Sequence, residues 1–176
     1  NIDSILADYL VRLHGQSGVS LADLVARTGL LEDPLLELLQ KLDSVTLTHQ
    51  DPVWAVHNAD LEVLKDQIVV FLEQFHSSHP LATGISREEL RERFFNRAPN
   101  SHFQFVLKNL EEEGRIQASH SVVSSYGRQV TLNSEQEKLK QDILQLHIKT
   151  GLQPPTLDEL LKKFPQNTRT LRDLYY

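Results

Sequence analysis

The chain of 176 residues contains no cysteine, which excludes disulfide bonds and metal sites built from thiolates. A chain without cysteine is compatible with the reducing cytoplasm, where we expect this protein. No segment approaches the roughly 20 consecutive apolar residues that span a bilayer, and no secretory signal is present. We therefore expect no membrane partner.

Methionine is also absent, even at position 1, which predicts a fragment, a processed chain, or a chain whose modified residues are left out. The sequence has no nucleophile elbow, P-loop or glycine-rich dinucleotide turn. Its eight histidines form no zinc-binding pair four residues apart on a helix with a carboxylate. We therefore predict that this part of the protein is not an enzyme and holds no cofactor or metal.

Three helix-capping sequences recur along the chain and begin at Ser20, Ser86 and Thr156. In each, the hydroxyl can accept a hydrogen bond from a backbone N–H, and the acid three residues later can accept one from the backbone N–H of the hydroxyl residue. The first sequence is the weakest because its acid is aspartate. The starts lie 66 and 70 residues apart. A repeat of this length predicts a tandem array of one small domain.

The first and second units each have a pattern of three helices followed by two short β-prone segments, an order typical of a winged helix, and the third has the three helices alone. We predict a mainly α fold with small β-hairpins (α+β), built from tandem winged-helix, or helix-turn-helix, domains. The predicted boundaries are 1–58 for the first unit, 59–133 for the second and 134–176 for the third. The third unit stops before its wing, so we expect a truncated chain or a disordered remainder.

Several local expectations follow from the same patterns. One face of the first helix carries Ile2, Ile5, Leu6, Tyr9, Leu10 and Leu13. The wing of the second unit is predicted to pair residues 115–118 with 129–132 around a tip at 124–127. At the end of the first helix in each unit a histidine recurs, where its cation would meet the negative end of the helix dipole: His14, His76 and His147.

Charge is distributed unevenly, with three basic and nine acidic residues in 1–61 and more basic residues toward the C-terminus. Nucleic-acid binding draws on clustered Lys and Arg at the exposed start of a third helix. The first unit offers acids there, and the second offers Arg97, Asn100, Ser101, His102 and Gln104. The candidate nucleic-acid residues of the third unit are Lys162, Lys163, Arg169 and Arg172. The alternative for these cations is a solvated helix face.

The acids Glu111, Glu112 and Glu113 crowd the end of another predicted helix, where the macrodipole disfavours negative charge. Three consecutive positions point to different sides of a helix and do not converge as catalytic carboxylates must. We therefore expect a solvated helix end that pairs with a neighbouring unit.

Four segments, 79–91, 110–116, 152–156 and 171–176, resemble the C-terminal winged-helix extension of the bacterial selenocysteine-specific elongation factor. The resemblance covers most of the chain and is strongest from Leu61 onward. It implies an arm of winged helices that links a body, which binds GTP with magnesium, to a terminal unit that binds mRNA.

The same resemblance implies, for the full-length protein, the mRNA selenocysteine-insertion hairpin, selenocysteinyl-tRNA and the ribosome as partners, and a monomer. A second hypothesis is a winged-helix scaffold that binds partner proteins in a regulatory complex. The net charge of −6 favours this scaffold over a DNA-binding repressor.

Overall fold

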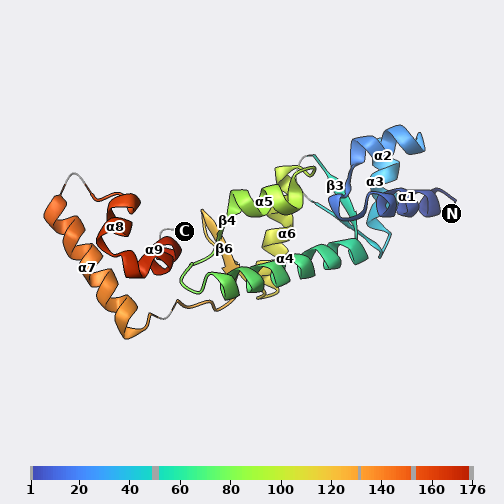
Figure 1. The fold of residues 1–176 in the computed structure, drawn as a ribbon. Coiled ribbons are helices and arrows are strands. Elements are labelled where there is room, and N and C mark those ends of the chain that lie inside the picture. Colours follow the sequence, from blue (N-terminus) through green and yellow to red (C-terminus); the bar gives the residue numbers. More distant parts are fainter. Residues whose placement is uncertain (1, 49–51, 131, 152–153, 175–176) are drawn as a thin grey trace.

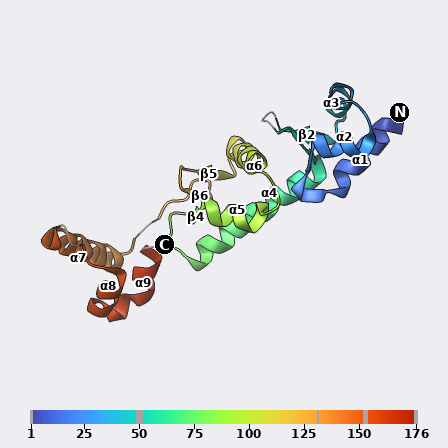
Figure 2. The ribbon, with the colours of Figure 1, turned by 90° about the horizontal axis from the view of Figure 1, so that it is seen from above.

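The computed structural model describes residues 2–48, 52–130, 132–151 and 154–174 and places three groups of helices in a row along the chain (Figure 1). The view from above shows the same row (Figure 2). Small antiparallel sheets accompany the first two groups, and the mainly α, α+β winged-helix fold is confirmed. The predicted unit boundaries stay predictions, and the unit names are kept below for the same residues. No helix among the described residues combines the length and the apolar character that spanning a bilayer requires.

The first unit packs its helices on a sheet of order β1-β3-β2. Its apolar core takes residues from all three helices and all three strands and includes the fully buried Leu24, Leu35 and Leu39. The elements are α1 (Ile2–Leu13), a 3₁₀ turn η1 (Gly15–Ser17), β1 (Val19–Ser20), α2 (Leu21–Thr28), α3 (Glu32–Gln40), β2 (Val45–Leu47) and β3 (Trp54–His57).

The second unit repeats this plan with a longer first helix and a larger core. Its sheet has the equivalent order β4-β6-β5. The elements are α4 (Asn58–Ser78), β4 (Ile85–Ser86), α5 (Arg87–Phe95), α6 (Asn100–Glu112), β5 (Ile116–Ala118) and β6 (Val122–Ser125).

Described residues of the third unit form helices and no strand: α7 (Ser134–Thr150), α8 (Leu157–Lys163), a 3₁₀ turn η2 (Pro165–Asn167) and α9 (Thr168–Leu174). Their core is small and consists of Leu139, Ile143, Leu160 and Leu171. It shares no residue with the core of the second unit. The predicted third helix extends to Tyr176, which lies outside the described residues.

The wing of the second unit differs from its prediction. The return strand is β6, at Val122–Ser125, and the described residues of 129–132 are not a strand. The turn therefore lies at residues 119–121, where the backbone N–H of Ser119 donates to the carbonyl of Val122. Sequence analysis also missed β1 and β4, two-residue strands whose pairing partners lie more than 30 residues away.

The three helix caps are confirmed in their main feature. The side chains of Ser20, Ser86 and Thr156 accept hydrogen bonds from the backbone N–H three residues later. Thr156 forms the complete reciprocal box with Glu159, whereas the hydroxyl of Ser20 donates to the Asp23 carboxylate at 2.7 Å. These caps fix where the second helix of each unit begins.

One strand connects the first two units. Ala55 of β3 is buried in the core of the first unit, and its neighbour Val56 is buried in the core of the second. Adjacent residues of a strand point to opposite faces, so β3 serves both cores. The strand then runs directly into α4, whose first residue, Asn58, donates from its backbone N–H to Ser44 O and from Nδ2 to Asp43 O, both at 2.8 Å. The first and second units are therefore joined without a linker.

Candidate nucleic-acid interface

A winged helix reads nucleic acid with exposed residues at the start of its third helix, and in the first unit these are acidic. Glu32, Asp33 and Glu37 of α3 are all exposed. Glu37 pairs with Lys41, just after the helix, at 3.8 Å, and both side chains are largely in solvent. This surface repels phosphate, as the sequence indicates.

In the second unit, contacts within the protein engage the residues at the start of α6. His102 is fully buried, and its Nε2 donates to the carbonyl of Gln16 in the first unit at 3.3 Å. Burial lowers the pKa of His102, so the ring is neutral near pH 7. The Oε1 of Gln104 accepts a hydrogen bond from Arg87 at 2.6 Å. The prediction that His102 contacts a nucleic-acid groove is therefore wrong, because its ring is buried against Gln16, which is 86 residues away in sequence.

The third unit presents its four candidate cations to solvent. Lys162 and Lys163 form the last turn of α8, and Arg169 and Arg172 lie one turn apart on α9. All four are exposed, and none is in an ion pair among the side chains that the structure describes. The short turn η2 separates the two helices, so all four lie in one helix-turn-helix. Their role in binding nucleic acid stays a prediction.

Neutralising these four cations tests that prediction. In the full-length protein, K162Q/K163Q/R169Q/R172Q is expected to weaken binding to an RNA hairpin and to reduce the slope of log affinity against log salt by up to ~3, since each lost phosphate contact removes about 0.7 to 0.9. Gel-shift titration at several salt concentrations measures both.

The matched control removes the same charge from exposed cations of the first two units, in R12Q/R27Q/K41Q/K108Q. This control should leave the salt slope almost unchanged. Equal slopes in both variants would show that the third-unit cations are a solvated helix face.

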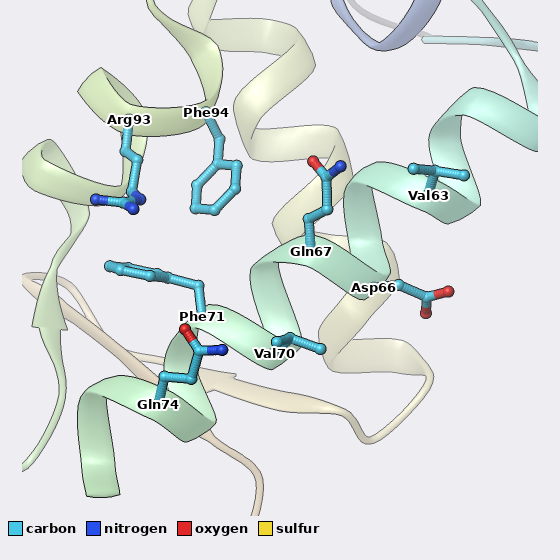
Figure 3. A pocket seen from close by; sticks show the side chains of 8 residues that line it. All are labelled: Val63, Asp66, Gln67, Val70, Phe71, Gln74, Arg93 and Phe94. Atoms are coloured by element: carbon cyan, nitrogen blue, oxygen red, sulfur yellow. The ribbon is translucent and has the colours of Figure 1, made fainter. Parts of the chain in front are cut away.

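A groove of about 420 Å³ lies between α4 and α5 of the second unit (Figure 3). The guanidinium of Arg93 lies over the ring of Phe71 at 4.4 Å, and Phe94 meets that ring edge-on at 5.6 Å. Val63 and Val70, which also line the groove from α4, are about half exposed. The groove combines aromatic faces with a single cation. Sequence analysis missed it because helical periodicity does not show which faces of two helices come together.

The acids at the end of α6 hold the second unit together. Glu113 binds the buried Lys65 of α4 at 2.5 Å, and Glu111 accepts the N–H of Ala118 in the wing at 2.8 Å. Burial lowers the pKa of Lys65, but its hydrogen bonds to Glu113 and Glu62 outweigh burial and leave the pKa raised. The expectation that these acids pair with a neighbouring unit is wrong, because these partners lie within the second unit.

Two of the three recurrent histidines behave as helix-end residues. The Nδ1 atoms of His14 and His147 lie 2.8 and 2.9 Å from the carbonyl oxygens four residues earlier. His76 differs: it is buried, and its Nε2 accepts the N–H of Ser125 at 3.3 Å. Burial, followed by the charge of Arg128, lowers the pKa of His76 and overturns the expectation of a cation there. Among the described residues, no cluster of His, Asp or Glu is suited to hold a metal ion.

Comparison with known proteins finds a family that matches the second unit. The family described as "Elongation factor SelB, winged helix" matches residues 69–124, from within α4 to the last strand of the second unit. Residues 69–124 are thus similar to a SelB winged helix. The segments 79–91 and 110–116, which carry the resemblance in the second unit, fall inside this match.

The similarity to SelB proteins extends beyond residues 69–124. A selenocysteine-specific elongation factor of Desulfomicrobium baculatum is 26% identical over 167 residues, which cover 93% of this chain. The chain spans about a quarter of the length of that relative, whose matched part is 26% of its sequence. The resemblance to a SelB winged-helix extension is therefore confirmed.

Proposed function

We propose that this chain is a rigid arm of a selenocysteine-specific elongation factor. The arm links a body that binds GTP and selenocysteinyl-tRNA to a terminal unit that binds the mRNA selenocysteine-insertion hairpin. The observation that carries the proposal is strand β3, whose Ala55 and Val56 serve the cores of two successive units. A shared strand of this kind fixes the distance between the units that it joins, whereas a flexible linker does not.

Charge along the arm supports this role. The acidic first unit is repelled by RNA phosphates, and the exposed cations of the third unit suit the end that lies nearer to RNA. In this scheme the factor is a cytoplasmic monomer, GTP and magnesium bind outside this chain, and the arm raises the effective concentration of one tRNA at one codon.

Lengthening the arm tests the proposal. Four Gly-Ser residues inserted between Leu132 and Asn133 of the full-length protein leave every buried core residue in place. We expect a severalfold loss of selenocysteine incorporation at a reporter codon with unchanged affinity for the hairpin, because the ends are no longer held at a fixed spacing.

The control carries the same four residues between His120 and Ser121, at the exposed tip of the second wing. This insertion should leave incorporation unchanged, since it does not alter the path between units. Full incorporation by the Leu132–Asn133 variant would refute the rigid-arm function.

A further inference from the structure

Helix α1 exposes an apolar stripe. Its five members lie on one face, at spacings of three, four and seven residues, and their exposed fractions range from 39% to 81%: Ile2, Ile5, Leu6, Tyr9 and Leu13. The core of the first unit is reached instead by Ala7, Leu10 and Val11 from the opposite side of the helix. The apolar face that the sequence indicates is thus mostly turned to solvent. A contiguous stripe of this kind marks an interaction surface.

A second copy of this chain is a poor partner for the stripe. A 12-residue helix is about 18 Å long, so a single stripe of it falls far short of the roughly 800 Å² per partner that a stable interface buries. The first unit also has eight acidic and only three basic residues, so two copies would repel each other. A suitable partner therefore carries basic charge, and it must be tethered to this chain because the contact area is small.

A tethered partner is available if the rigid-arm proposal holds, because the matched part of the Desulfomicrobium baculatum factor is only 26% of that protein. We infer that the α1 stripe docks on an apolar patch rimmed by Lys and Arg, located in the part of the same polypeptide outside these 176 residues. Tethering supplies a high effective concentration, so a small apolar contact suffices. This docking fixes the first unit against the body of the factor, as β3 fixes the second unit against the first.

Two tyrosines of the chain provide an internal comparison for the test. Tyr9 of the stripe is 59% exposed and Tyr126, beyond the second wing, is 68% exposed. Without docking they should be oxidised at similar rates in hydroxyl-radical footprinting of the full-length protein. With docking, we expect Tyr9 to react at least ~3-fold more slowly than Tyr126, since the centre of an interface excludes water.

Matched variants then assign the protection to the stripe. Ile5 is 71% exposed in α1 and Ile148 is 72% exposed in α7. Ile5→Asn should restore fast oxidation of Tyr9 with an unchanged circular dichroism spectrum, while Ile148→Asn should leave Tyr9 protected. Both substitutions add the same polar group at nearly the same exposure.

Three results would overturn the docking. These are equal rates for Tyr9 and Tyr126 in the unmodified protein, continued protection in Ile5→Asn, and protection that disappears on dilution, which would indicate a second copy. The footprinting uses no RNA and no translation assay. Failure of docking is therefore distinguishable from failure of the rigid-arm function, which the insertion variants test.

Discussion

Replacing Val56 with aspartate is expected to unfold the first and second units in one step. Val56 has no exposed surface and lies in the core of the second unit, while Ala55 beside it lies in that of the first. An unpaired carboxylate in apolar surroundings costs several kcal/mol, on the order of 4 or more, against a total stability of about 5 to 15 kcal/mol for a domain. Displacement of β3 also removes the central strand of the first sheet.

Differential scanning calorimetry measures this effect. The unmodified chain should show one transition for the first two units and another for the third, whose core is separate. Val56→Asp should abolish the first and preserve the second. The control, Val63→Asp, places the same charge on the 47%-exposed surface of α4 and should change stability by no more than about 0.5 kcal/mol. A first unit that melts normally in Val56→Asp would show that the two cores are independent.

Helix starts and the overall plan were predictable from the sequence, because their signals are local. A hydroxyl at Ser20 or Thr156, followed by an acid and an apolar pattern, determines a helix start within a few residues. The equivalent order of elements in the first two units follows from repetition of those local signals. The fold class could therefore be predicted from the sequence without any knowledge of tertiary contacts.

The wing was less predictable, since several β-prone segments compete for one partner. Val122 and Val123 are as strand-prone as the predicted 129–132, and Gly127 suggested a tip that the structure places after the strand. Strand pairing is decided by packing: Val123 is fully buried in the core. Two-residue strands such as β4 have no sequence periodicity to detect.

The candidate interface was also predictable only in part. Exposure of the third-unit cations follows from their polar helix faces, but the burial of His102 depends on Gln16 in another unit. Likewise, helical periodicity grouped six apolar residues of α1 on one face, but Leu10 among them packs in the core while the other five are exposed. Periodicity cannot tell whether such a face meets the core or another surface. Contacts between units are the part of this protein that a single sequence does not determine.

Gly18→Ala is expected to destabilise the first unit by about 2 to 4 kcal/mol, from backbone strain combined with a steric clash. Gly18 has φ of +64° and ψ of −172°, a region that essentially only glycine populates and that costs another residue roughly 1 to 3 kcal/mol. A Cβ at this position would also lie 2.6 Å from Nε1 of Trp54 and 2.7 Å from the carbonyl oxygen of Ala55. The Nε1 of Trp54 donates to Ser17 O at 2.7 Å, so the ring cannot move without losing that bond.

Gly15→Ala separates the two causes. Gly15 has a similar φ of +54°, but a Cβ there meets nothing within 4 Å, so strain alone applies and the cost should be about 1 to 2 kcal/mol. Urea unfolding followed by Trp54 fluorescence measures both variants, because this is the single tryptophan of the chain. Equal losses would mean that the sheet yields to the added methyl group. A larger loss in Gly18→Ala means that the loop before β1 is packed rigidly against β3, the strand that holds the first two units together.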